Sequence, residues 1–261
     1  MRRRQFIAGL GSAAAWPVVA WAQQRALPVI GFVNAGAADA SADYVAAFRK
    51  GLGETGFVEG QNVTVEYHWL EGQYDRLPAL MADLVRRRVA VIATGSAAAV
   101  LEAKAATATI PIVFGVADDP VKLGLVTSLA RPGGNATGIN FFNIEMTAKR
   151  LALLHEVVPK AVHVAVLANP ANAMNTETTL REVREAARAM GLRIQVLNAS
   201  TIPEIDVAFA KFAREHPDAI YIASDSFFFS RHVQIATLAA RERLPAVYWT
   251  RDIVAAGGLM S

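Results

Sequence analysis

The chain has 261 residues, 53% of them hydrophobic, and it contains no cysteine. The composition therefore excludes disulfide bonds, thiolate metal sites, cysteine nucleophiles and lipid attachment through a cysteine. The 26 Lys and Arg outnumber the 23 Asp and Glu only through the three arginines at residues 2–4, so the rest of the chain is neutral and gives no electrostatic reason to expect nucleic-acid binding.

The first 22 residues have the pattern of a cleavable export signal. The arginines at 2–4 precede an apolar stretch at 6–15, and Ala-Trp-Ala at 20–22 is typical of a cleavage site. Residues 3–7 also match the twin-arginine export pattern, although an ordinary secretory signal or a disordered N-terminus would be an alternative. No later apolar run approaches the about 18 to 20 residues that span a bilayer. We therefore predict export to the periplasm.

Strand-like and helix-like segments alternate after this leader. In the first half, short apolar runs predict strands at residues 28–33, 63–69, 89–93 and 112–116. Apolar residues spaced three and four apart predict helices at residues 39–54, 74–87 and 97–107. Turn-forming residues then occupy 131–135, and 137–142 is read as a connecting strand.

The alternation restarts in the second half. Helices are expected at residues 144–158, 177–190, 205–215 and 229–243, and strands at 162–167, 193–197, 219–223 and 246–249. Strands separated by helices predict an α/β fold with parallel sheets covered on both faces. We expect two doubly wound lobes, at 23–138 and 139–261. Because residues 257–261 follow a strand and a turn, a closing C-terminal segment is expected to be absent.

Ligands of open parallel sheets bind outside the carboxyl ends of the strands. Polar residues follow nearly every predicted strand of this chain. We therefore predict that these loops bind a small molecule, with contacts from Asn34, Tyr44, Thr94, Ser96, Asp119, Asn169, Asn172, Asp225 and Ser226.

Several of these residues have an equally good structural interpretation. Ser96, Asp119 and Asp225 stand where side chains cap helices, and Asn169 and Asn172 are common turn formers. As a ligand contact, the Asp225 carboxylate would suit an amine. The aromatic residues near the loops would either enclose a flat ligand or belong to the core; they are Tyr44, Phe227, Phe228 and Trp249.

The sequence contains no complete catalytic motif. The Gly-x-Gly-x-x-Ala at 9–14 lies in the leader and follows no strand. Ser96 does not stand in Gly-x-Ser-x-Gly, and the histidines at 68, 155, 163, 216 and 232 form no metal-binding pair. Asp118 and Asp119 with Asp225 would allow acid–base chemistry, but no nucleophile accompanies them. We expect no catalytic residue, metal or cofactor.

The residues that carry a family resemblance begin at about 28 and lie in the segments 48–60, 111–116, 119–120, 124–125, 131–138 and 257–261 and at position 225. On these residues, the sequence resembles the ABC-transporter substrate-binding proteins of the type I periplasmic-binding fold, in the branch that includes tryptophan and tyrosine binders. In relatives, the positions of Thr94, Ser96, Asp119, Asn172 and Asp225 line the cleft between lobes. Residues 171–175 depart from the family pattern, which often has an acidic or second polar residue there.

The resemblance implies a monomeric periplasmic protein that closes around a small molecule by hinge motion and delivers it to an ABC permease in the inner membrane. An amino acid or aromatic compound is the implied ligand. Relatives continue past residue 261, which implies weakened lobe docking and exposed apolar surface in this chain. Three alternatives stay open: an exported enzyme using Asp119 or Asp225, the ligand-sensing module of a repressor, and the partner of a membrane sensor kinase.

Overall fold

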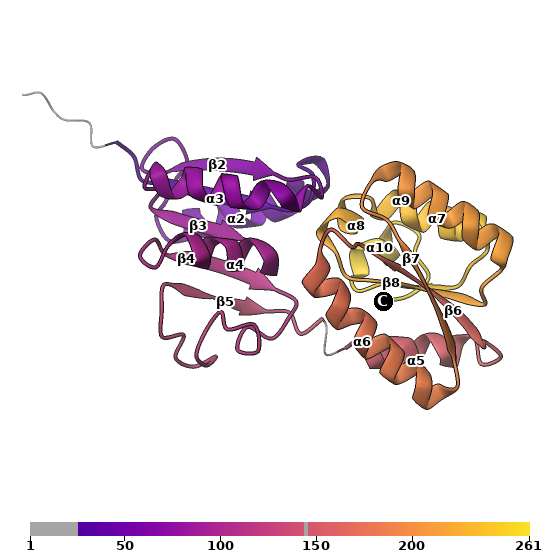
Figure 1. Cartoon of the computed structure of the whole chain (residues 1–261). Coiled ribbons are helices and arrows are strands. Elements are labelled where there is room, and N and C mark those ends of the chain that lie inside the picture. Colours follow the sequence, from indigo (N-terminus) through magenta and orange to yellow (C-terminus); the bar gives the residue numbers. More distant parts are fainter. Residues whose placement is uncertain (1–25, 144–145) are drawn as a thin grey trace, which may run out of the picture.

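The computed structural model describes residues 26–143 and 146–261, which form two parallel sheets with surrounding helices. Figure 1 shows the two units side by side, the first in indigo to magenta and the second in orange to yellow. We call them the first and the second lobe. The predicted leader, its cleavage site and the twin-arginine pattern lie outside the described residues.

The first lobe has five strands in the order β2-β1-β3-β4-β5, and every neighbouring pair is parallel. The strands are β1 (Val29–Asn34), β2 (Thr64–Trp69), β3 (Val91–Thr94), β4 (Ile112–Val116) and β5 (Ala136–Asn140). The helices are η1 (Asp39–Ser41), α2 (Ala42–Glu54), η2 (Tyr74–Arg76), α3 (Leu77–Arg86) and α4 (Ala97–Ala106). Met81 and Leu84 of α3 pack with Ile92 on one face, and α2 packs on the other through Phe48 and Leu52.

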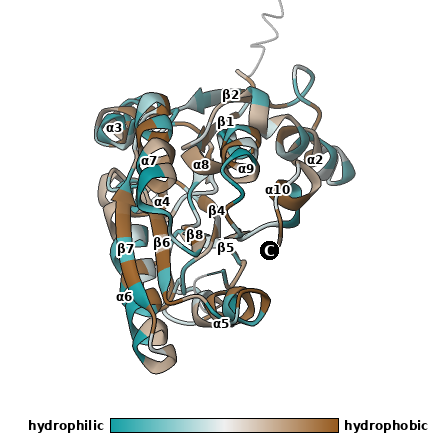
Figure 2. Cartoon of the chain, turned by 90° about the vertical axis from the view of Figure 1, so that its right-hand side faces the viewer, coloured by the Kyte–Doolittle hydropathy of each residue, from teal (hydrophilic) through white to brown (hydrophobic). Residues whose placement is uncertain are grey.

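The second lobe has four parallel strands in the order β7-β6-β8-β9. They are β6 (His163–Ala168), β7 (Arg193–Asn198), β8 (Ala219–Ile222) and β9 (Ala246–Val247). The helices are α5 (Thr147–Val157), α6 (Ala173–Met190), α7 (Ile202–Glu215), α8 (Ser226–Ser230), α9 (His232–Arg241) and α10 (Arg251–Ala255). Apolar side chains of α5 and α6 cover one face of this sheet, and those of α7 and α9 cover the other. Figure 2 shows hydrophobic residues along β6, whose residues 164–168 are all buried, as expected for a parallel strand covered on both faces.

The predicted order of strands and helices is confirmed, with three local corrections. The predicted helix 229–243 is two helices that meet at Arg231, whose φ of −116° and ψ of 18° are not helical. The predicted turn after β9 contains the short helix α10, which Thr250 caps by accepting a hydrogen bond from the backbone N–H of Asp252. The helix predicted at 177–190 begins four residues earlier, at Ala173.

The predicted boundary between residues 138 and 139 falls inside β5, which pairs with β4 along its whole length. The division of the chain into folding units stays a prediction.

Next to this boundary, large apolar side chains of the first sheet are exposed, including 45% of Val113, 61% of Ile139 and 55% of Phe141. This end of the first sheet is therefore an apolar surface that adjoins the space between the lobes.

Candidate functional site

The carboxyl ends of strands from both lobes surround a cavity of about 770 Å³. The first lobe contributes the ends of β1, β3 and β4, and the second contributes the segments after β8 and β9. An apolar part of the cavity extends over the exposed end of the first sheet, where Val113, Gly115 and Ile139 line it. Its polar part lies between the lobes, and its lining residues include Asn34, Ser41, Tyr44, Thr94, Gly95, Ser96, Asp118, Asn172, Asn175, Ser224, Asp225, Ser226, Phe229, Trp249 and Thr250.

Seven of the nine predicted contact residues line this cavity, namely Asn34, Tyr44, Thr94, Ser96, Asn172, Asp225 and Ser226. Asn169 and Asp119 do not line it. The topology therefore brings most of the predicted residues to one place, although their contact with a ligand stays a prediction.

Asp225 is the most heavily hydrogen-bonded of these residues. Its Oδ1 accepts from the backbone N–H groups of Phe227 and Phe228, at 2.9 and 3.2 Å, and from Asn169 Nδ2 at 3.0 Å. Its Oδ2 accepts from Asn172 Nδ2 and from the hydroxyl of Tyr74, both at 3.0 Å. A carboxylate offers about four lone-pair sites, so these five donors saturate it. A ligand amine of the kind expected from the sequence would have to displace one of them.

The Tyr74 hydroxyl joins the two lobes through this carboxylate. Tyr74 belongs to η2 of the first lobe, and both Tyr74 and Asp225 are more than nine-tenths buried. Burial first, and then the charge of Asp225, raises the pKa of Tyr74 well above its ordinary value, so the hydroxyl keeps its proton and donates. Sequence reasoning missed Tyr74 because its partner lies 151 residues away and no local motif connects them.

Asn169 supports Asp225 from behind the cavity wall. Its Nδ2 donates to Asp225 Oδ1, while its own Oδ1 accepts from the backbone N–H of Ala171 and from the Ser200 hydroxyl, at 3.1 and 2.9 Å. It is 1% exposed. Asn169 therefore acts as a structural link between loops of the second lobe, which agrees with the turn-forming alternative.

On the first lobe, Thr94 and Ser96 stand at the junction of β3 and α4. Ser96 is the N-cap residue of α4, yet its side chain accepts no capping hydrogen bond. Its backbone N–H donates to Thr94 Oγ1 at 3.4 Å. The Ser96 side chain therefore does not cap α4, and Ser96 lies in the cavity wall.

Of the two neighbouring aspartates after β4, Asp118 rather than Asp119 lines the cavity. The Asp119 Oδ1 accepts from the backbone N–H groups of Val121 and Lys122 at 2.8 and 3.3 Å, in an exposed turn. Asp118 is 4% exposed. The position of Asp118 in the loop after β4 could have identified it as a cavity residue from the sequence. The Asp-Pro pattern instead favoured Asp119.

Three aromatic side chains line the polar part of the cavity. Tyr44 of α2 packs against Phe229 of α8 with ring centroids 5.3 Å apart, so this pair crosses between the lobes, and Trp249 follows β9. Phe227 and Phe228, which the sequence also offered as ligand contacts, are 3% and 0% exposed and pack in the core of the second lobe. Phe229 was missed because it lies inside the predicted helix.

A second pair of groups also joins the lobes near Tyr44. The Tyr44 hydroxyl donates to Asp252 Oδ2 at 3.1 Å. Burial, and then the charge of Asp252, raises the pKa of Tyr44 to about 12. At Gly36, a Cβ atom would stand 2.9 Å from the carbonyl oxygen of Ser226 in the opposite lobe. The two lobes therefore lie so close together at Gly36 that a side chain there would collide with the opposite lobe.

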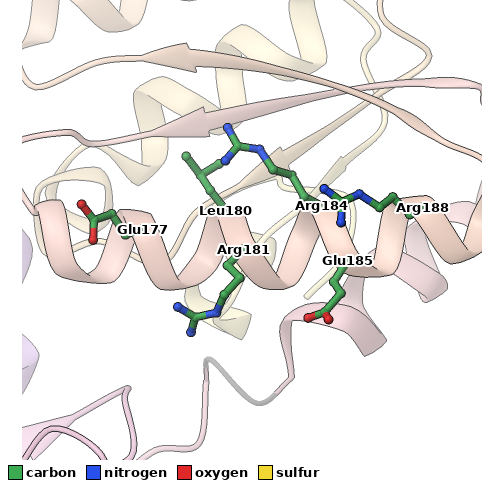
Figure 3. A pocket seen from close by; sticks show the side chains of 6 residues that line it. All are labelled: Glu177, Leu180, Arg181, Arg184, Glu185 and Arg188. Carbon is green, nitrogen blue, oxygen red and sulfur yellow. The ribbon is translucent and has the colours of Figure 1, made fainter.

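Another hollow, of about 390 Å³, runs along α6 (Figure 3). Its six lining residues all belong to this helix: Glu177, Leu180, Arg181, Arg184, Glu185 and Arg188. Since one helix surface forms it and no second element closes it, it lacks the convergent walls of a ligand site.

Within the described ranges, no group of His, Asp or Glu side chains is arranged to hold a metal ion, and none of the helices there is both long and apolar enough to cross a membrane.

Comparison with known proteins identifies a family and individual relatives of this chain. Residues 26–261 match the family described as ABC transporter substrate binding protein. The curated "Tyrosine-binding protein" of Clostridioides difficile (strain R20291) is 24% identical over 213 residues, which are 81% of this chain and 60% of that protein. The chain thus spans less than two thirds of this relative's length.

Solved structures share the fold at low sequence identity. A conserved domain protein from Vibrio cholerae superposes with a TM-score of 0.74 at 23% identity, over 89% of this chain and 77% of that one. The ABC domain in complex with L-Trp from Streptococcus pneumonia gives 0.72 at 20% identity, with the same coverage. An R. palustris solute-binding protein in complex with benzoate gives 0.60 at 14% identity, over 88% of this chain and 65% of that one.

Proposed function

Because the chain belongs to the ABC transporter substrate-binding protein family, we propose that it captures a small molecule between its lobes and delivers it, chemically unchanged, to an ABC permease. The permease would lie in the inner membrane, and the protein would act in the periplasm as a monomer after removal of residues 1–22. Family membership supports the transport role, and the export pattern of the leader supports the location.

One observation carries this proposal: the polar ends of strands from two separate sheets converge on one cavity. Asn34, Thr94 and Ser96 face it from the first lobe, and Ser226 and Trp249 face it from the second. A molecule bound there touches both lobes at once and so stabilises the closed arrangement over an open one. Hinge closure needs no covalent chemistry, which is consistent with the lack of a nucleophile motif in the sequence.

The aromatic lining suggests a flat ring as part of the ligand. Tyr44 and Phe229 approach from opposite lobes, and Trp249 lies in the same wall. Aromatic rings of protein and ligand stack favourably, with about 0.5 to 1.5 kcal/mol per pair beyond the burial of area. A relative named for tyrosine and a fold neighbour that holds L-Trp support an aromatic amino acid or a related compound as the first candidates.

The proposal can be tested on the purified protein by a thermal-shift screen of amino acids, aromatic acids, aromatic amines and nucleosides. Hits would be followed by small-angle scattering, which measures closure, and by mass spectrometry of the recovered ligand. We expect a compound that raises the melting temperature, reduces the radius of gyration and is recovered intact. Chemical conversion of the bound compound, or binding that Trp249→Ala and Ser96→Ala leave unchanged, would contradict the proposal.

A further inference from the structure

A buried arginine lies behind the cavity wall where the chain passes from the first lobe to the second. Arg150 belongs to α5 of the second lobe and is 6% exposed. Its Nη2 donates to the backbone carbonyl oxygen of Asn143 at 2.8 Å. Asn143 follows the last strand of the first lobe and lines the cavity, whereas Arg150 does not line it. This hydrogen bond therefore attaches a cavity residue of the crossover to the second lobe.

The guanidinium of Arg150 also contacts the sheet of the second lobe. Its Cζ lies over the ring of Tyr221, 5.5 Å from the centroid, and Tyr221 is a fully buried residue of β8. The ring face attracts the cation, and the planar guanidinium stacks on it in a way that a lysine cannot reproduce. Burial lowers the pKa of Arg150, and Tyr221 opposes that shift. Because Ser224 and Ser226 follow β8 in the cavity wall, Arg150 relates the position of Asn143 to that of the second-lobe wall.

The first lobe holds the crossover from its own side. The backbone N–H of Phe141 donates to the carbonyl oxygen of Val116 at 2.9 Å, and Asn140 Oδ1 accepts from the backbone N–H of Phe142 at 2.7 Å. Phe142 has a φ of 54°, in the left-handed region that residues other than glycine seldom adopt. Such a conformation persists only where the surrounding contacts fix it. The segment is thus held at one end by the first sheet and at the other by α5.

Given the proposed binding function, on which this inference rests, we propose that Asn143 is a ligand contact and that Arg150 is the residue that positions it. Arg150 engages the carbonyl oxygen of Asn143, so the side-chain amide is the part of Asn143 that serves the ligand. An amide both donates and accepts hydrogen bonds. The group that fits it is therefore a hydroxyl, carboxyl or amide of the ligand, and Arg150 acts only by holding the amide in place.

A double-mutant cycle tests the link between the two residues. Calorimetry would compare the wild type, Asn143→Ala, Arg150→Met and the double variant, with L-tyrosine and L-tryptophan, or the strongest hit of the broad screen, as probes. Each single change should weaken binding about fivefold to tenfold, as expected for one hydrogen bond to the ligand. The double variant should bind as Asn143→Ala does, because Arg150 acts through the amide already removed. Losses that multiply would overturn the proposal, since a merely structural role of Arg150 does not depend on that amide.

The variant Arg150→Lys provides a rescue. Lysine keeps a cationic donor but lacks the planar group that stacks on Tyr221. It should recover part of the affinity that Arg150→Met loses, and it should have no effect in the Asn143→Ala background. An Arg150→Lys variant that lowers the affinity equally in the presence and absence of the Asn143 side chain would contradict the positioning role.

Lys104→Met is the matched control. The Lys104 Nζ donates to the backbone carbonyl oxygens of Gly124 and Leu125, at 2.8 and 2.7 Å, and none of these three residues lines the cavity. Removing this cation should leave the affinity for the probes unchanged. A loss as large as that of Arg150→Met would show that the effect is not specific to the crossover and would overturn the proposal.

Hydrogen exchange measures the crossover without a ligand. In Arg150→Met, the backbone amide of Phe142 should exchange about fivefold faster than in the wild type, because the segment is held at one end only. The amides of β1 should keep their rates. Arg150→Lys gives the same comparison if Arg150→Met does not fold. Unchanged exchange at Phe142 in the folded variants would overturn the positioning role.

Failure of this inference can be told apart from failure of the proposed function. If a probe binds and closes the lobes in scattering experiments while the cycle shows independent losses, Arg150 does not position Asn143 and the binding function stands. If no compound in the broad screen binds, the proposed function fails, and the ligand contact of Asn143 fails with it.

Discussion

The contact between Tyr74 and Asp225 makes a quantitative prediction about closure. Tyr74→Phe removes one hydroxyl and keeps the ring, so the hydrogen bond to Asp225 Oδ2 is lost while the packing of η2 is retained. A hydrogen bond to a charged acceptor is worth about 1.5 to 3 kcal/mol. Because Asp225 keeps four other donors, we take the lower limit of about 1.5 kcal/mol, which is close to a tenfold change in an equilibrium constant.

The bond exists only where the lobes meet, so its loss should shift the balance between closed and open states about tenfold toward the open state. Tyr74 does not line the cavity. The variant should therefore weaken every ligand by the same factor, at most about tenfold, without changing the order of preference among ligands. Small-angle scattering of the ligand-free protein should show a larger mean radius of gyration, and calorimetry should show the uniform loss of affinity.

Tyr67→Phe is the matched control. The Tyr67 hydroxyl contacts Arg49 Nε at 2.9 Å and Glu59 Oε2 at 3.2 Å, and all three residues belong to the first lobe. This variant should change neither the scattering curve nor the affinity. Two results would refute the reasoning. One is that Tyr74→Phe leaves both the scattering curve and the affinity at the wild-type level. The other is that it weakens the binding of one ligand and not of another, because the hydrogen bond between Tyr74 and Asp225 would then not stabilise the closed state as such.

The remaining predictions concern packing, capping and pH. Gly36→Ala should disfavour closure in scattering experiments, because its Cβ would stand 2.9 Å from the Ser226 carbonyl oxygen; unchanged scattering would contradict this. Ser96→Ala should leave the melting temperature nearly unchanged, since the side chain makes no cap bond, whereas Thr201→Ala, which removes a realised cap, should cost about 1 kcal/mol in chemical denaturation. Because the pKa of Tyr74 is raised in the folded state, its contribution to the free energy of unfolding is fully present below pH 10 and is lost as pH rises above that value. In chemical denaturation at increasing alkaline pH, the free energy of unfolding should therefore fall more steeply for the wild-type protein than for Tyr74→Phe.

The sequence predicts the architecture of this protein better than the details of its cavity. Alternating strands and helices leave few topologies, since βαβ crossovers are short and right-handed, and both parallel sheets appear in the structure. Local breaks were less predictable. The interruption at Arg231 involves neither proline nor glycine, and α10 is too short, at five residues, to show a helical period.

The same distinction holds for the site. Loops after strands could be located from the sequence, because the carboxyl ends of parallel strands share one edge. Which side chain of a loop faces the cavity depends on backbone turns: Asp119 is engaged by its own turn, and the adjacent Asp118 lines the wall. Pairs such as Tyr74 with Asp225 arise only when two lobes meet, and no periodicity within either lobe encodes them.

Asp225 shows why capping and site formation need not be alternatives. Its Oδ1 satisfies the first backbone N–H groups of α8, and its Oδ2 faces away from that helix toward Asn172 and Tyr74. A carboxylate has two oxygens with about four lone-pair sites, so one oxygen can cap the helix while the other accepts from the partner lobe. The position of α8, and with it Phe229 in the cavity wall, is thereby coupled to the first lobe. Asp225 thus caps α8 and also provides a contact that exists only when the lobes are together.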